Sequence, residues 1–193
     1  VLHFIFYVAF IVTQIELLEI MIDGAFGTHR FVYHLVEHIA PLRALYVCTV
    51  SSIEVLSLLT FFVTIIFFIR RDMLKIPRLA SIDLEGWPNM DAHLILLMEI
   101  NLIVNIFLMN TADMAASNGE YGLWLSGIFS GAFAGWDVEV LHILAKVGWW
   151  GHLAGVLGFL MYLSISKHLH ILLAFPNTYF SRQTPKGYMD NME

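Results

Sequence analysis

Four apolar stretches, each long enough to cross a bilayer, dominate this chain. They cover residues 1–22, 44–69, 92–110 and 142–173. About 20 helical residues cross a hydrocarbon core about 30 Å thick, and lipid admits only helices or closed barrels, because every backbone polar group there needs a partner. Charged residues make up only 13% of the chain, against roughly 25% in soluble domains. We therefore predict an all-α integral membrane protein, a bundle of about four transmembrane helices.

Basic residues predict the orientation of this bundle. Arg70 and Arg71 follow the second span, and Lys167 and Arg182 lie at or beyond the end of the fourth. Because cytoplasmic loops are rich in Lys and Arg, we expect both ends of the segment to be cytoplasmic and the loop 23–30 to be external. Residues 1–175 would form the membrane domain, and residues 176–193 a cytoplasmic tail or a linker. The chain lacks an initial Met, so we expect residues to be missing at one or both ends.

Charge and cysteine content exclude some classes of function. The formal net charge of −6 is spread over loops and helix ends, which gives no case for nucleic-acid binding. Cys48 is the one cysteine, so this segment can hold neither a disulfide nor a cysteine-ligated iron–sulfur cluster. Redox chemistry within these residues would have to use histidine.

Two histidines of the last predicted span have a spacing suited to haem. His152 and His170 are 18 residues apart, which is about five helical turns and about 27 Å of rise. Both imidazoles would then point from one helix face, one toward each edge of the bilayer. Two stacked haems need that arrangement, so we predict His152 and His170 as axial ligands of two b-type haems.

Each of these haems needs a second imidazole on the other side of its iron, from another element of the chain. By depth, we expect His3 to lie opposite His170 at the cytoplasmic edge. His29, in the first loop, would lie opposite His152 at the external edge.

Other residues are candidates for holding the macrocycle. Arg30 beside His29 can bind a haem propionate, because guanidinium pairs with carboxylate through two hydrogen bonds, and Lys167 is a further cofactor-binding candidate. Small residues along the last span leave room either for a flat ring or for close helix packing. They are Gly148, Gly151, Gly155 and Gly158.

Acidic residues inside the spans suggest quinone and proton chemistry. Glu16 and Glu19 lie three residues apart on one face of the first span, and Glu99 lies in the third. A carboxylate without a partner in lipid stays neutral and can exchange a proton beside a quinone. The alternative is a set of hydrogen bonds between helices.

A short motif points to a different class of protein. His34-Leu-Val-Glu37-His38 has the H-x-x-E-H form, in which one helix carries two zinc ligands and a catalytic base. It would make the chain a membrane metallopeptidase. The match covers five residues and marks no third ligand.

Three motifs near the end of the chain resemble those of a known family. They are Gly151-His152-Leu-Ala-Gly, Ser166-Lys-His-Leu-His170-Ile and Phe175-Pro-Asn-Thr-Tyr179. They resemble the final helix of the membrane cytochrome b (gamma) subunit of respiratory nitrate reductase. Related membrane subunits of heterodisulfide reductase and of the sulfite-reduction electron-transfer complex share the pattern. In that family the two histidines of this helix each ligate one b haem, and His152 and His170 hold the matching positions.

The likeness is closer to the membrane domain of bacterial iron–sulfur oxidoreductases of the heterodisulfide reductase type, particularly those of Bacteroidetes. This closer likeness also rests on Leu2-His3-Phe4, Glu16-Leu-Leu-Glu19-Ile, Asp23-Gly24 and Phe26-Gly27-Thr28-His29-Arg30. It implies a fifth transmembrane helix upstream. It also implies that a cytoplasmic domain with two 4Fe–4S clusters can follow.

The function implied by the resemblance is electron transfer. The chain would pass electrons between menaquinone in a bacterial plasma (inner) membrane and a cytoplasmic iron–sulfur protein or domain. It would do so beside other membrane subunits of a respiratory or photosynthetic complex.

One position departs from the nitrate reductase pattern. Thr13 stands where that family has a second ligand on the early helix, and threonine does not ligate haem iron. Either His29 replaces that ligand or the outer haem is absent, so two haems and one haem both stay open. A haem-free membrane anchor or quinone-binding subunit is a further alternative.

Overall fold

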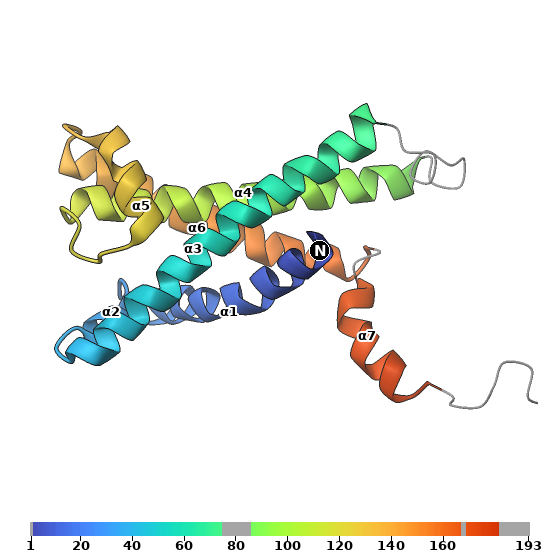
Figure 1. The fold of residues 1–193 in the computed structure, drawn as a ribbon, viewed down its shortest axis with the longest axis horizontal. Helices are drawn as coiled ribbons and strands as arrows, with labels where there is room; N and C mark the ends of the chain where they lie inside the picture. Colours follow the sequence, from blue (N-terminus) through green and yellow to red (C-terminus); the bar gives the residue numbers. More distant parts are fainter. Residues whose placement is uncertain (1, 75–85, 167–168, 182–193) are drawn as a thin grey trace, which may run out of the picture.

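The computed structural model describes residues 2–74, 86–166 and 169–181, and the side chains of His3 and His170 lie outside that description. Its elements, drawn in Figure 1, are α1 (Leu2–Phe26), α2 (Phe31–Val36), α3 (Ala40–Phe68), the π-helical turn η1 (Ile69–Met73), α4 (Trp87–Ala116), α5 (Trp124–Phe129), the 3-10 turn η3 (Ser130–Phe133), α6 (Val138–Leu163) and α7 (Leu169–Tyr179). All regular structure within the described ranges is helical, which confirms the predicted all-α class.

Three helical stretches are long and apolar enough to cross a membrane. They are Ala40–Met73, Asn89–Ala116 and Val138–Leu163. They include the second and third predicted spans and most of the fourth. The first predicted span lies in α1, which is 25 residues long but is not one of the three. By this measure the described part of the chain has three membrane-length helices where we predicted four.

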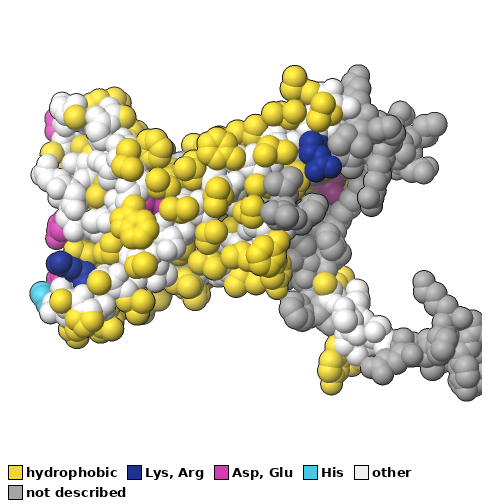
Figure 2. Space-filling view, viewed as in Figure 1, with side chains coloured by type: hydrophobic (Ala, Val, Ile, Leu, Met, Phe, Trp, Pro, Cys, Tyr) yellow, Lys and Arg dark blue, Asp and Glu magenta, His cyan; other side chains and the backbone are white. Residues whose placement is uncertain are grey.

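The visible surface suits a bilayer. Figure 2 shows hydrophobic side chains over the middle of the face, with Lys, Arg, Asp, Glu and His side chains mostly toward its two ends. Large apolar side chains of several helices are exposed, including Phe10, Leu18, Phe62, Leu97 and Leu157. Apolar surface of this extent is unfavourable in water and favourable in lipid. The structure therefore agrees with a membrane protein.

The last predicted span, residues 142–173, is two helices in the structure. α6 ends at Leu163 and α7 begins at Leu169. At the end of α6 the amide of Ser166 donates to the carbonyl of Leu163, a short-range bond that tightens a last helical turn, and serine hydroxyls compete with helical hydrogen bonding. The prediction that five turns of one helix join the two histidines is therefore wrong.

Glycines bring α6 directly against α4, and we call this contact the glycine seam (Gly148, Gly151 and Gly155 of α6). A Cβ at Gly148 would lie 2.7 Å from the backbone nitrogen of Met109, and one at Gly155 would lie 2.8 Å from Leu102. A Cβ at Gly151 would overlap the side chain of Asn105. Small residues allow such backbone contact between membrane helices. Of the two alternatives for these glycines, the structure therefore shows helix packing.

The fourth glycine of the predicted set lies outside the seam. A Cβ at Gly158 would meet nothing within 4 Å. Of the four glycines, Gly158 is therefore the one at which a side chain would have open space.

Candidate functional site

One carboxylate holds the loop between α1 and α2. Asp23, in the last turns of α1, accepts hydrogen bonds from the backbone N–H of Arg30 at 2.8 Å and of Phe31 at 3.0 Å, and from the hydroxyl of Thr28 at 2.8 Å. Those two amides lie at the N-terminus of α2, where the first N–H groups of a helix have no partner within the helix. Arg30 itself has a left-handed φ of 50°, which is unfavourable for a residue with a Cβ. The contacts of the loop hold it in that conformation.

The side chain of Arg30 points into the helix bundle and is 4% exposed. Its Nη2 donates to Oδ1 of Asn110 at 2.6 Å and lies 3.4 Å from Oδ2 of Asp113. The guanidinium carbon lies 4.7 Å from the centre of the Tyr121 ring, a cation–π contact. The guanidinium predicted to bind a haem propionate is therefore already engaged with residues of α4.

Five carboxylates surround this guanidinium, and we call the whole group the Arg30 cluster. Its acidic members are all buried: Glu16, Glu19, Asp23, Glu54 and Asp113. Asn110 connects two of them, Glu16 and Glu54, to Arg30. Its Nδ2 lies 3.2 Å from Oε1 of Glu16 and 3.4 Å from Oε1 of Glu54. The hydroxyl of Tyr46 donates to Glu19 at 2.9 Å. Four elements, α1, the loop, α3 and α4, thus meet at one polar site.

Glu54 has the most hydrogen-bond donors of the five carboxylates. Besides Asn110, it accepts from the backbone N–H of Leu125 at 3.1 Å, from that of Ser126 at 3.3 Å, and from the hydroxyl of Ser126. These donors belong to the first residues of α5, so Glu54 fastens α5 to α3.

The charges of the Arg30 cluster do not balance if every acid is ionised. Arg30 is the one buried basic side chain in the described part of the chain. Two like charges 4 Å apart repel by about 4 kcal/mol at an effective dielectric constant near 20, and an unpaired buried charge is strongly destabilising. One guanidinium cannot offset five ionised carboxylates at that cost. Arg30 could therefore offset only part of the charge of the five acids.

His29 connects the Arg30 cluster to the exposed loop. Its side chain is 52% exposed, and its Nε2 lies 3.2 Å from Oδ2 of Asp113. The hydrogen bond with Asp113 raises the pKa of the imidazole above its ordinary value, although partial burial opposes the rise. The nitrogen that would ligate iron is thus bound to a carboxylate, so His29 as placed here does not fit axial ligation of haem.

His152 lies half-buried in α6 and is held by α4. Its Nδ1 is 3.0 Å from the carbonyl oxygen of Leu102. A carbonyl can only accept, so Nδ1 carries the hydrogen, and Nε2 keeps its lone pair. Leu102 lies at the middle of α4 (Trp87–Ala116). We predicted His152 near the external edge, whereas it contacts the middle of the neighbouring helix.

The structure does not bring His29 and His152 together. Their partners on α4, Asp113 and Leu102, are 11 residues apart, which is about 16 Å along a helix axis. The pairing of these two histidines about one iron was predicted from depth alone. α6 begins at Val138, so His152 lies farther from the start of its helix than a span beginning at residue 142 would place it.

The other predicted site residues divide into two groups. Lys167 and the side chains of His3 and His170 lie outside the described residues. Glu99 is partly exposed on α4, one turn before Leu102, and no hydrogen bond or ion pair joins it to another described residue. Unlike Glu16 and Glu19, it is not part of the Arg30 cluster.

The metallopeptidase motif does not form a metal site in the structure. α2 ends at Val36, so His38 is not on the same helix as His34. Glu37 instead lies 3.1 Å from His34 Nδ1 and 3.5 Å from His38 Nε2. Within the described residues no group of three histidine, cysteine or acidic side chains could hold a metal ion.

Sequence reasoning missed several residues of the Arg30 cluster and of its hydrogen-bond partners. Asp113, Asn110 and Tyr46 were not candidates, because single polar residues in an apolar helix do not reveal their partners. The available signal was the pair Asn110 and Asp113, three residues apart in α4 and therefore on one helix face.

Comparison with known proteins gives one relative. The chain is 27% identical over 207 aligned residues to the "Probable iron-sulfur-binding oxidoreductase FadF" of Bacillus subtilis (strain 168). The alignment covers 100% of this chain and 25% of that protein, so the chain spans about a quarter of its relative's length. No family model matches the chain, and no solved structure matches it. The match supports a broad relationship to an oxidoreductase.

Proposed function

We propose that this chain is the membrane electron-transfer unit of a quinone-linked oxidoreductase. It would hold two b haems and pass electrons between menaquinone and a cytoplasmic iron–sulfur protein or domain. The proposed location is the bacterial plasma membrane, beside other membrane subunits of a larger complex. The name of the Bacillus subtilis relative supports the iron–sulfur partner, and the three membrane-length helices support the location.

The observation that carries this proposal is the state of His152. Its Nδ1 donates to the Leu102 carbonyl, and its Nε2 has no hydrogen-bond partner among the described residues. A neutral imidazole with one nitrogen oriented by a carbonyl and the other free is what an axial haem ligand requires. His152 therefore fits one side of a haem iron. His170, with His3 opposite, is the proposed ligand pair of the second haem.

The haem would supply one-electron chemistry, and the chain's residues would supply the rest. The Leu102 carbonyl fixes the ring and tautomer of His152. Apolar helices keep water away. The proposed groups for taking protons from a quinol or giving them to a quinone are three carboxyls. Two are Glu16 and Glu19 in the Arg30 cluster, and the third is Glu99 on the membrane-length helix α4.

A single-haem or haem-free membrane anchor is the second candidate function. The observation that favours it is the engagement of His29 with Asp113 at 3.2 Å, which leaves His152 without the opposite ligand we predicted. In the single-haem form, only the pair of His3 and His170 would bind haem.

A reduced-minus-oxidised absorption spectrum with haem quantification per chain tests these forms. We expect b-type haem in the wild type, loss of one haem in His152→Ala, and loss of one in His170→Ala. His142→Ala, an exposed position on the same helix as His152, is the matched control and should keep the wild-type content. Haem that is insensitive to His152→Ala would leave the single-haem form, and no haem at all would establish the anchor.

A further inference from the structure

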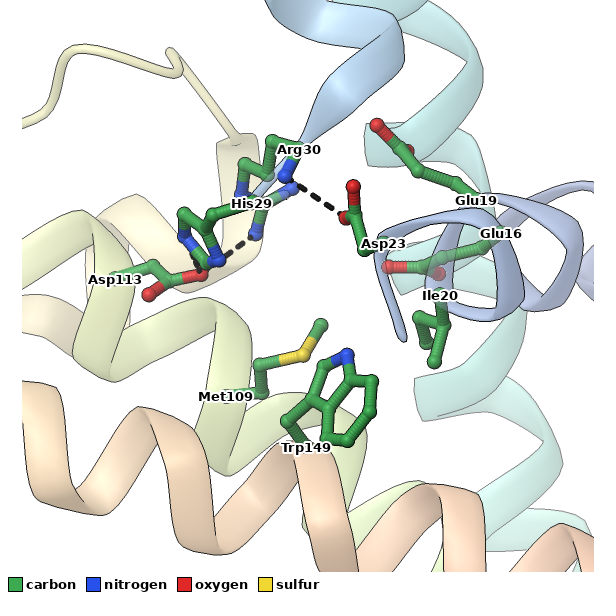
Figure 3. Close-up of a pocket in the computed structure, with 9 residues that line it drawn as sticks. All are labelled: Glu16, Glu19, Ile20, Asp23, His29, Arg30, Met109, Asp113 and Trp149. Atoms are coloured by element: carbon green, nitrogen blue, oxygen red, sulfur yellow. Dashed lines mark hydrogen bonds and ion pairs between the residues drawn. The ribbon is translucent and has the colours of Figure 1, made fainter. Parts of the chain in front are cut away.

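The Arg30 cluster encloses a small cavity with polar walls. Its volume is about 10 Å³, about the least that admits one water molecule. Figure 3 shows the residues that line it, which are Glu16, Glu19, Ile20, Asp23, His29, Arg30, Met109, Asp113 and Trp149. A buried water also needs two to four polar partners, and the acidic and basic side chains of this wall offer them.

Two buried polar atoms of residues that line this cavity make no hydrogen bond within the described part of the chain: Nε of Arg30 and Oδ2 of Asp113. Oδ2 of Asp113 lies in ion-pair range of His29 and Arg30. Buried N–H groups are nearly always paired, with protein or with ordered water. A water in the cavity would accept the hydrogen of Nε and could donate to a carboxylate on the facing wall.

We propose that the cavity binds one water molecule, and that this water completes a proton relay from His29 at the exposed loop, through Asp113, to Glu16 inside the helix bundle. His29 Nε2 lies 3.2 Å from Asp113 Oδ2, which is the first contact of the relay. Asp113 and Glu16 line the same cavity, so one water can touch both. The inference deepens the proposed function, in which Glu16 transfers protons, but it does not require haem.

The relay moves protons and no electrons. Protonated His29 gives its Nε2 hydrogen to the Asp113 carboxylate. Asp113 then passes a proton to the water as the water gives another to the Glu16 carboxylate. At the end His29 is neutral, Glu16 is protonated, and Asp113 and the water are unchanged.

Glu16 is the proposed endpoint because it lines the cavity and has fewer hydrogen-bond donors than Asp23 or Glu54. Asp23 accepts three hydrogen bonds and Glu54 four, whereas Glu16 accepts one, from the Asn110 nitrogen that it shares with Glu54. The charged and titratable groups that face this site from the packed elements are Glu19 and Asp23 of α1, His29 and Arg30 of the loop, Tyr46 and Glu54 of α3, Asp113 of α4, and Tyr121.

Infrared spectroscopy of the whole purified chain tests the relay. The carbonyl stretch of protonated Glu16 is the band that Glu16→Gln removes, and transfer into heavy water shifts it as the proton exchanges. We expect fast exchange in the wild type and exchange slower by about 100-fold in Asp113→Asn, which is the scale of a positioned proton-transfer group. His29→Gln should slow exchange in the same direction.

The matched control is Asp91→Asn. Asp91 is a buried carboxylate of the same helix, it accepts a hydrogen bond from Tyr162, and it does not line the cavity. It should exchange at the wild-type rate. Unchanged exchange in both Asp113→Asn and His29→Gln would overturn the relay, as would the absence of any band removed by Glu16→Gln. His29 is half-exposed, so His29→Gln remains informative if Asp113→Asn does not fold. Haem content measured on the same samples separates failure of the relay from failure of the proposed function.

Discussion

The Arg30 cluster and the glycine seam are both buried contacts of α4, but opposite physical terms hold them together. The cluster joins α1, α3 and α4 through charges and hydrogen bonds around one guanidinium. The seam joins α4 to α6 through bare backbone contact at Gly148, Gly151 and Gly155. Protonation should therefore change the stability of the Arg30 cluster, whereas added side-chain volume should change the stability of the glycine seam. Glu16 and Glu19 belong to the cluster, whereas His152 lies on the helix of the seam and contacts Leu102 of α4.

Removing the guanidinium should have the largest effect. In Arg30→Met the acids of the cluster lose their only buried cation, and breaking a buried ion pair from one side costs about 3 to 5 kcal/mol in free energy of unfolding. The loss should shrink in acid, where protonated carboxyls no longer repel. Thermal unfolding in detergent at neutral and acidic pH measures both effects. Arg43→Met, at an exposed position, is the control, and an equal loss in the two variants would contradict the charge argument.

A methyl group in the glycine seam should come next. Gly148→Ala would place a Cβ 2.7 Å from backbone of Met109, which a side-chain rotation cannot relieve, so we expect a loss of about 1 to 3 kcal/mol from overpacking. Gly158→Ala, with nothing within 4 Å, should be nearly neutral. The two variants are compared by unfolding and by size-exclusion chromatography. Unlike the loss in Arg30→Met, this one should not vary with pH.

A smaller effect is expected from one hydroxyl of the Arg30 cluster. Tyr46→Phe removes the O–H that donates to Glu19 at 2.9 Å, which should cost about 1 kcal/mol. Tyr7→Phe, an exposed tyrosine of α1, is the matched control for detergent unfolding. If the two substitutions had the same effect, the hydrogen bond would not contribute to stability.

The smallest expected effect is a pH dependence from His29. Its pKa in the folded chain is raised above the ordinary value of 6.5 by Asp113. The stabilisation is therefore fully present below that ordinary value, and it is lost as the pH rises through the folded pKa. Since the ring is 52% exposed, solvent screening limits the contribution to about 0.2 to 1 kcal/mol.

Unfolding temperatures over a pH series measure this contribution. The difference between wild type and His29→Gln should be present in acid and absent in alkali. In a chain that already carries Asp113→Asn, His29→Gln should no longer change the unfolding temperature in acid. A difference that grew with rising pH would have the wrong sign for this ion pair.

The glycine seam was easier to predict from the sequence than the Arg30 cluster. Apolar length and composition were sufficient for the all-α membrane class, and the glycine spacing already suggested helix packing as one of two alternatives. The Arg30 cluster was less accessible, because Arg30 and Asp113 are 83 residues apart in the chain and a loop arginine gives no sign that it will be buried. Glu16 and Glu19 were candidates from their spacing alone, without their partners.

Helix ends limited the haem prediction. Hydropathy continues from residue 142 to residue 173, so it indicated one long span and one depth for His152. At the break after Leu163 the backbone makes short-range hydrogen bonds, such as that from Ser166 to Leu163, and hydropathy does not report such local bonding. The tautomer of His152 followed only once Leu102 was known as its neighbour.

The left-handed backbone of Arg30 sets local stereochemistry against the needs of the site. At a φ of 50° glycine would relieve a cost of about 1 to 3 kcal/mol, so a search for stabilising substitutions based on backbone preference would replace this residue early. The same replacement would remove the positive charge that five buried acids share. Such conflicts between local rules and global structure are expected at functional sites. In this chain, local backbone preference and the charge balance of the site favour different residues at a single loop position.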